Sequence, residues 1–225
     1  MHEQLPPGIE FNNEIKQKII FGISAALFYL SSKKILIKSL NYESILFDDQ
    51  LNPLLSDFEF SYLVKDLTYS PDYNECVESL TEPPEVYKQM CSEQNSSDFH
   101  AIIQSEQNII FSWAHVVNSI LQERRLYKYG GYSDAYQFYV MENSRPKLVG
   151  QEYPIYRNLI IKGFHKDPNK RPTSTEIILN LLRDEAMLPN VDIRTMKEHQ
   201  KALLLTPFMI SIENQEEMGF VECPY

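Results

Sequence analysis

The sequence lacks the features that carry a chain into or across a membrane, and it has few cysteines. No apolar run approaches the ~18 residues needed to span a bilayer, and residues 1–7 have neither the basic nor the apolar region of a signal peptide. The three cysteines are far apart, and no pair has metal-ligand spacing: Cys76, Cys91 and Cys223. We therefore expect a cytoplasmic protein with free thiols and no membrane contact.

Basic residues are also few, and none of them gather in a block. The 225 residues carry 21 Lys and Arg against 31 Asp and Glu, a formal net charge of −10 at pH 7. Nucleic acids and anionic membranes attract basic patches, so neither is expected as a main partner. Because 43% of the residues are apolar and 12% are aromatic, the chain is expected to bury a sizeable core.

Apolar residues recur at helical spacing in four segments, which predict the main helices: 13–33, 106–122, 154–163 and 193–205. In the second of these segments, apolar residues occupy nearly every face, so we expect it to be the buried central helix. Asn13 is a plausible cap for the first helix. Thr173 with Glu176 three positions later is the signature of a capping box before a further helix.

The remaining segments are shorter or have no period. The apolar runs at 35–37 and 45–47 are too short for helices and predict a small strand pair. Short helices are expected at 86–91 and near 133–142, and the polar stretches 61–82 and 92–100 are predicted to be loops. The predicted fold class is therefore mainly α with a few short β-strands, followed by an irregular acidic stretch at 206–225.

Four blocks, in the correct order, resemble the large lobe of the eukaryotic protein kinases. They are the helix with Tyr29-Leu30-Ser31-Ser32, the loop 35–49, Asp57-Phe58, and the block 167–177 that begins Asp-Pro-Asn-Lys-Arg-Pro-Thr. The loop resembles the catalytic loop His-Arg-Asp-Leu-Lys-Pro-Glu-Asn-Ile-Leu, and Asp57-Phe58-Glu59 resembles Asp-Phe-Gly.

This resemblance covers about residues 10–183 and implies three parts of the chain. They are a remnant of the hinge region at 1–12, a kinase-like large lobe at 13–185, and a C-terminal helix with an acidic tail at 186–225. No glycine-rich loop and no Val-Ala-Ile-Lys strand precedes the first helix, so we expect a large lobe without a complete small lobe. The chain is then either a fragment of a longer protein or a stand-alone large lobe.

Most reactive side chains of the family's catalytic loop are replaced. Ser39 stands at the catalytic Asp, Asn41 at the Lys and Ser44 at the metal-binding Asn, so the resemblance implies no catalytic residue. Serine is a poor base, and a single hydroxyl is a weak ligand for Mg²⁺. Asp57 survives, either as a residual Mg²⁺ or nucleotide contact or as a turn cap. Leu46 stands where the family places an apolar side chain beneath adenine, although burial in the core is the favoured interpretation.

Residues that support the architecture are retained. In the family, the Glu of Ala-Pro-Glu, here Glu85, pairs with the Arg of the late block, here Arg171. We expect this ion pair to form and to anchor the activation segment, because Arg offers a bidentate partner to a carboxylate. Ile37, Phe58 and Ile109 are expected to form an apolar column that replaces the hydrogen bonds of the family residues.

Three functions remain open. The first is a catalytically inactive pseudokinase lobe that acts in signalling as a scaffold or binding module for a protein partner, with no required cofactor. The second is a fragment of a protein kinase of the Ser/Thr type that uses ATP and Mg²⁺. The third is a helical interaction protein with no nucleotide role. Thr68, Ser70 and Tyr73 are candidate phosphorylation sites, and the Tyr-rich stretch 126–156 is a candidate partner surface. The oligomeric state is not predicted.

Overall fold

The computed structural model describes residues 8–37, 40–58, 61–63, 81–90, 105–124 and 132–213. Most of its elements are helical, which confirms the predicted fold class. In chain order they are α1 (Asn13–Ser32), β1 (Ile35–Leu36), β2 (Ile45–Phe47), β3 (Pro53–Leu55), β4 (Tyr62–Leu63), α2 (Pro84–Met90), α4 (Glu106–Gln122), α5 (Tyr132–Tyr136), the π-helical turn η3 (Gln137–Met141), α6 (Pro154–Gly163), η4 (Pro168–Lys170), α7 (Ser174–Leu181), η5 (Asp184–Ala186) and α8 (Ile193–Glu213).

Helix α4 is the central helix, as predicted. All residues from 108 to 121 are buried, because neighbouring elements cover every face of the helix. Trp113 lies in its middle and donates a hydrogen bond from Nε1 to Ser24 Oγ of α1 at 2.8 Å. Helix α6 approaches on another face so closely that a Cβ at Gly163 would lie 2.6 Å from the Cβ of Ala114. These contacts place α4 at the core of the molecule.

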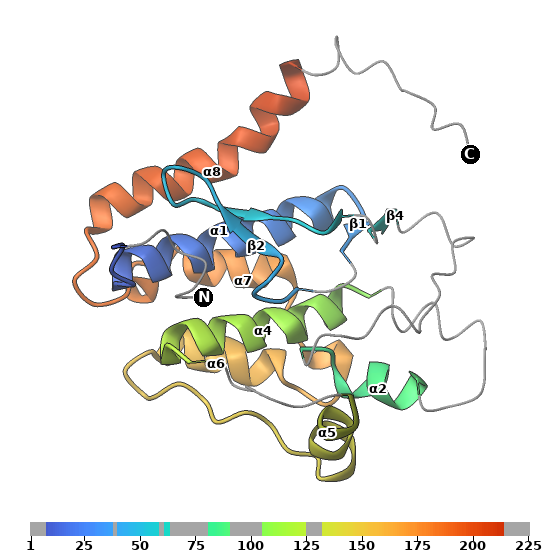
Figure 1. Cartoon of the computed structure of the whole chain (residues 1–225). Helices are drawn as coiled ribbons and strands as arrows, with labels where there is room; N and C mark the ends of the chain where they lie inside the picture. The colour runs from blue at the N-terminus through green and yellow to red at the C-terminus, as the bar shows by residue number, and fades with distance from the viewer. Residues whose placement is uncertain are drawn as a thin grey trace.

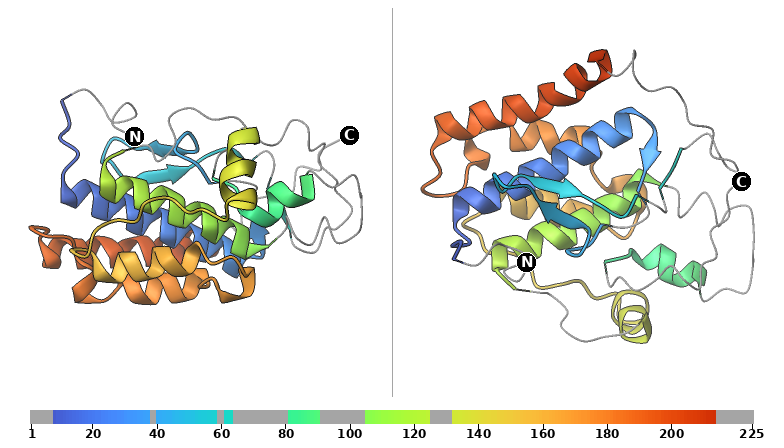
Figure 2. Two further views of the ribbon diagram at one scale, coloured as in Figure 1. Left: turned by 90° about the horizontal axis from the view of Figure 1, so that it is seen from below. Right: turned by 45° about the horizontal axis from the view of Figure 1, so that its top comes forward.

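The elements form layers around α1 and α4. Figure 1 shows these two helices at the centre, with the β2–β3 hairpin in front of α1 and α8 along its outer side. In Figure 2 (left), α6 and α7 lie on the opposite side of α1 and α4 from the hairpin. Pro53 of the hairpin reaches α1 at Gly22, where a Cβ would clash with the proline ring. Among the described elements, helices thus cover one face of the hairpin.

The ends of α1 and α8 differ from their predictions. The cap of α1 is Asn12 and not Asn13, because Asn12 Oδ1 accepts a hydrogen bond from Ile15 N at 3.1 Å. Asn13 instead donates from Nδ2 to Pro189 O at 3.0 Å, and so fastens α1 to the chain before α8. Helix α8 continues past residue 205 as far as Glu213, so the first part of the expected irregular tail is helical.

The short strands pair differently from the prediction. β1 pairs with β4, and β2 pairs with β3, so the runs at 35–37 and 45–47 do not pair with each other. The physical reason is a tight turn after β2, in which Asp48 Oδ1 accepts from Gln50 N at 2.9 Å and from Asn52 N at 2.8 Å. This turn returns the chain directly into β3. β4 also lies within the segment 61–82 that was predicted to be a loop.

The other helices follow their predictions closely. Helix α6 has the predicted bounds, and α7 begins with the predicted capping box, in which Glu176 N donates to Thr173 Oγ1 at 3.1 Å and Thr173 N donates to Glu176 Oε2 at 2.8 Å. Helix α2 begins two residues earlier than predicted. The predicted loop at 92–100 and residues 64–80 lie outside the described residues. Within the described ranges, no helix combines the length and apolar content needed to span a bilayer.

Candidate functional site

The loop that resembles a kinase catalytic loop closes on itself at residues 41–44. Asn41 Oδ1 accepts from Ser44 N at 2.8 Å, while Ser44 Oγ accepts from Asn41 N at 3.2 Å and donates to Asn41 O at 3.0 Å. Ser44 is buried, and its carbonyl accepts a further bond from Ser56 N. Both side chains therefore hold the turn. Ser44 does not fit the role of a Mg²⁺ ligand, since its oxygen is buried within the turn.

The residue at the family's catalytic position cannot be placed in this turn. Ser39 and Lys38 lie outside the described residues, as does Glu59. Asp57 is exposed and has a left-handed backbone with a φ of 61°. That conformation is uncommon outside glycine, although Asp adopts it more readily than most residues. Asp57 therefore marks a sharp change of chain direction after β3.

The predicted apolar column is wrong for Phe58. Ile37 and Ile109 are both buried, but Phe58 is 44% exposed. The chain turns at Asp57, so Phe58 follows β3 on the surface of the molecule and does not join the other two residues. Two members of the predicted column are thus in the core and the third faces solvent.

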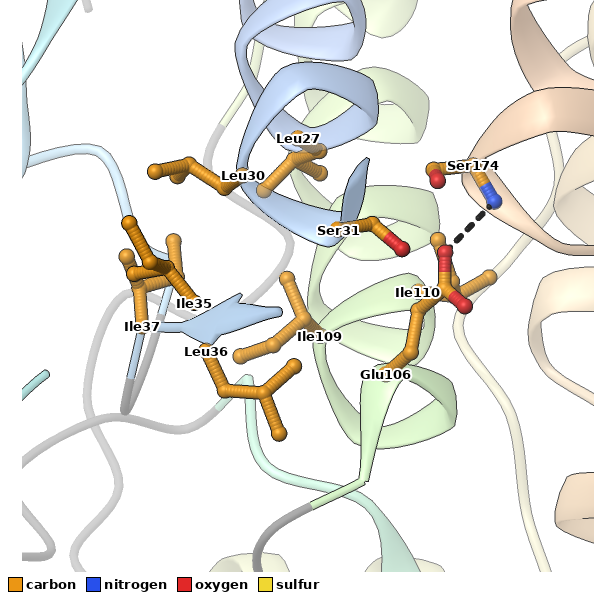
Figure 3. Close-up of a pocket in the computed structure, with 10 residues that line it drawn as sticks. All are labelled: Leu27, Leu30, Ser31, Ile35, Leu36, Ile37, Glu106, Ile109, Ile110 and Ser174. Carbon is orange, nitrogen blue, oxygen red and sulfur yellow. Dashed lines mark hydrogen bonds between the residues drawn. The ribbon is translucent and has the colours of Figure 1, made fainter. Parts of the chain in front are cut away.

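Ile37 and Ile109 instead line a small apolar pocket where the end of α1, β1 and the start of α4 meet (Figure 3). The pocket has a volume of about 20 Å³, enough for about one water molecule. Glu106 forms its polar edge, and Glu106 Oε1 accepts a hydrogen bond from Ser174 N at 2.9 Å. A nucleotide does not fit in this pocket, because sites for ligands of that size are at least about tenfold larger.

Leu46 lies on the exposed face of the hairpin. It is 52% exposed, and its cross-strand partner Leu54 is 49% exposed. Side chains alternate along a strand, so the neighbours Ile45 and Phe47 pack towards the core while Leu46 points away from it. The interpretation of Leu46 as a core residue is therefore wrong.

Glu85 and Arg171 lie together and form a bidentate ion pair. Arg171 Nη1 is 2.5 Å from Glu85 Oε1, and Nη2 is 2.9 Å from Oε2. The Arg171 side chain is fully buried, and it also donates to Gln107 O and to His165 O, both at 3.0 Å. Its guanidinium carbon lies 5.1 Å from the centre of the Phe111 ring. One side chain thus connects α2, α4 and the chain that leads into α7.

Thr81 makes a second connection between the same segment and the loop. Its Oγ1 donates to Leu40 O at 3.0 Å, and its carbonyl accepts from Ser112 Oγ of α4 at 2.9 Å. Thr81 and Ser112 are both buried. Sequence reasoning missed Thr81, whose one signal is its position just before Pro83-Pro84-Glu85. The segment 81–85 is therefore fastened both to the catalytic-loop-like turn and to the central helix.

His115 is a titratable group that belongs to the core. Its Nε2 lies 2.8 Å from the hydroxyl of Tyr139, and the side chain is buried among aromatic rings. Burial lowers the pKa of His115 to about 3, so the imidazole is neutral near pH 7. It packs in the core and does not face a ligand in solvent.

Comparison with known proteins places this geometry in context. No known family model matches the chain. Over 160 residues, which make up 71% of the chain, it is 26% identical to the "Putative serine/threonine-protein kinase R436" of Acanthamoeba polyphaga mimivirus. The match covers 53% of that protein, so the chain spans about half the length of its relative. This distant similarity supports a kinase-like relationship, and the mainly helical fold is consistent with a kinase-like large lobe.

The candidate phosphorylation sites Thr68, Ser70 and Tyr73 lie outside the described residues.

Proposed function

We propose that the chain is a kinase-like large lobe that binds or scaffolds a protein partner and transfers no phosphate. The Asn41–Ser44 turn is the observation that carries this proposal. Phosphoryl transfer depends on positioning and on neutralising the charge of the phosphates, which the family does with a Lys and an Asn at these two positions. An amide and a hydroxyl that bond to the backbone of their own turn supply neither the positive charge nor the metal coordination.

The retained contacts support a binding role. The Glu85–Arg171 pair and the Thr81 hydrogen bonds fasten the segment 81–85 to the core, although the reactive residues of the adjoining loop are replaced. A helical core alone does not require a buried ion pair at this place. Such a pair contributes little net stability compared with well-packed apolar residues. We take the retention of the Glu85–Arg171 pair to mean that the surface around α2 is maintained for contact with another protein.

A phosphate-transfer assay tests this proposal. The purified chain is incubated with Mg²⁺, γ-³²P-ATP and peptides that carry Ser, Thr or Tyr, beside an Asp57→Ala variant as the matched control. We expect the chain and the variant to give the same background incorporation. We also expect ~1 mM Mg-ATP to raise the melting temperature by less than about 1 °C, because a ligand that binds weakly adds little to the unfolding free energy. Transfer that Asp57→Ala abolishes would overturn the proposal.

A second candidate function is phosphate transfer from ATP to Ser or Thr by a longer polypeptide that includes this chain. The observation that favours it is the mimivirus relative, whose name describes a serine/threonine kinase and of which the chain matches 53%. A version extended upstream would then transfer labelled phosphate, and Asp57→Ala would remove that transfer. An extended version with no such activity would leave the first proposal as the better one.

A further inference from the structure

Helix α8 has one side that packs against the molecule and another that is exposed. Met196 and Gln200 are buried, at 1% and 0% exposure. Lys201 is exposed, and Leu205 is 51% exposed. Because an α-helix turns by about 100° per residue, Lys201 and Leu205 lie on a side of α8 that is turned away from the buried pair. This helix therefore presents an apolar residue to solvent.

The exposed side continues along α8 as an apolar stripe. Residues 202–212 carry no charge, and Phe208 and Ile212 follow Leu205 at intervals of three and four positions. This spacing places the three residues on one face of α8, which runs on to Glu213. We call Leu205, Phe208 and Ile212 the α8 stripe. Its spacing is that of the a and d positions of a coiled coil, at which apolar residues of two helices interlock.

The end of α8 leaves the body of the molecule. Leu203 and Leu204 still pack against the core. Figure 1 shows the last turns of the helix, in red, well apart from α1, with no other described element beside them. At Leu205 the helix thus passes from its packed part to a part that the other described elements do not accompany. A helix with apolar residues on several sides is expected to be covered, so a partner is needed here.

Charges of opposite sign stand on the two sides of the α8 stripe. Residues 194–201 carry three Lys or Arg against one Glu, whereas residues 213–225 carry four Glu and no Lys or Arg. Two copies of α8 that run antiparallel and cross near Phe208 would bring the basic part of each beside the acidic part of the other. A parallel pair would oppose like charges. The charge pattern of α8 is therefore complementary to itself in one orientation.

We propose that the α8 stripe docks onto the α8 stripe of a second copy of this chain, with the two helices antiparallel about a twofold axis near Phe208. The two apolar stripes cover each other, and Lys201 of each copy lies near the acidic end of the other. A partner of a single charge would be repelled at one end of the stripe, which is why we assign the stripe to a second copy. Such an interface is isologous, so it closes as a dimer and does not extend into a filament.

Sedimentation equilibrium of the full chain tests the proposal. Between about 1 and 100 μM the chain should pass from monomer to dimer, as mass action requires. Leu205→Gln/Phe208→Gln should raise the dissociation constant of the dimer by about tenfold or more, because apolar area on both copies no longer gains burial. The matched control, Leu179→Gln, changes an exposed leucine on α7 and should leave the dissociation constant unchanged. Circular dichroism melting of each variant shows that it is folded.

Charge reversal tests the identity and the orientation of the partner. Lys201→Glu should weaken the dimer by about tenfold at low salt, because repulsion replaces attraction at two symmetric places. Adding Glu213→Lys and Glu216→Lys to the same chain should restore the dimer in large part, since opposite charges then face each other again. Lys170→Glu makes the same change of net charge at an exposed lysine on η4 and should have no effect.

Three outcomes would overturn the inference. A chain that stays monomeric at about 100 μM would show that no second copy covers the stripe. A dimer that Leu205→Gln/Phe208→Gln leaves intact would place the interface elsewhere. A dimer that Lys201→Glu weakens, but that the two added lysines do not restore, would reject the antiparallel arrangement. The inference concerns assembly and not phosphate transfer, so its failure is distinguished from failure of the proposed function by the phosphate-transfer assay.

Discussion

Replacing Glu85 by Gln should destabilise the fold by far more than the loss of a surface ion pair. The Arg171 side chain is fully buried and Glu85 is 19% exposed, so the neutral amide would leave a positive charge in the interior without its carboxylate. Breaking a buried ion pair by removing one partner costs about 3–5 kcal/mol. Since water reaches part of Glu85, and since Arg171 keeps its bonds to Gln107 O and His165 O, we expect about 3 kcal/mol.

Urea unfolding followed by circular dichroism measures this loss. For a chain of this size, about 3 kcal/mol corresponds to a fall in melting temperature of about 6–12 °C. A double-mutant cycle with Arg171→Met isolates the pair: once the buried charge is gone, Glu85→Gln should cost little more. We therefore expect a coupling energy close to the full cost of Glu85→Gln, about 3 kcal/mol.

The pair Arg194–Glu198 on α8 provides the matched control. Both side chains are largely exposed, at 89% and 70%, so Glu198→Gln should cost less than about 0.5 kcal/mol. If Glu85→Gln cost no more than Glu198→Gln, the argument from burial would be refuted. Hydrogen exchange adds a local measurement, in which the amides of 81–90 should exchange faster in Glu85→Gln than in the unchanged chain.

Three further predictions follow from individual contacts. The pKa of the buried His115 is about 3, below the value of about 6.5 in the unfolded chain. Below about pH 6.5 the unfolded chain therefore binds more protons than the folded chain, so the unfolding free energy decreases as the pH falls. Protonation of His115 in the unfolded chain should make the unfolding free energy about 1.4 kcal/mol lower at pH 5.5 than at pH 7.5. Urea titrations of His115→Gln at the two pH values should lack this difference. Gly163→Ala should destabilise by about 1–3 kcal/mol, because the added Cβ would lie 2.6 Å from that of Ala114, and Ala114→Gly should rescue it in a thermal melt. Thr81→Val should cost about 1–3 kcal/mol in urea by leaving the carbonyl of Leu40 without this donor, whereas Thr81→Ser should cost clearly less.

The helices could be predicted from the sequence because their signals are local. The all-round apolar pattern of 106–122 gave the bounds of α4, and Thr173 with Glu176 gave the capping box of α7. The cap of α1 was predicted one residue late, since Asn12 and Asn13 are both good caps and the sequence does not say which side chain is turned towards Ile15 N.

The strands could not be predicted in the same way. Strands of two or three residues have too few side chains to specify a partner, so the pairing of β1 with β4 and of β2 with β3 depends on the intervening turns. The exposure of Leu46 follows from alternation once Ile45 is known to face the core, yet three apolar residues in a row carry no sign of which one points outwards.

Contacts between distant parts of the chain were accessible only through the family resemblance. Glu85 and Arg171 are 86 positions apart, and nothing local in either segment indicates the other. The hydrogen bonds of Thr81 to Leu40 and Ser112 have no counterpart in the motifs, so they were missed. Long-range polar contacts of this kind depend on how the helices pack, which the apolar pattern constrains only in outline.

The Asn41–Ser44 turn shows how side chains without charge hold the shape of this loop. The backbone N–H and C=O groups of a buried turn need hydrogen-bond partners, which nearby side chains can supply. Here the replacing side chains bond back to the backbone of the same turn, with Asn41 Oδ1 accepting from Ser44 N and Ser44 Oγ donating to Asn41 O. Because Asn and Ser are among the residues that form such local bonds most readily, these two side chains stabilise the fold of the loop.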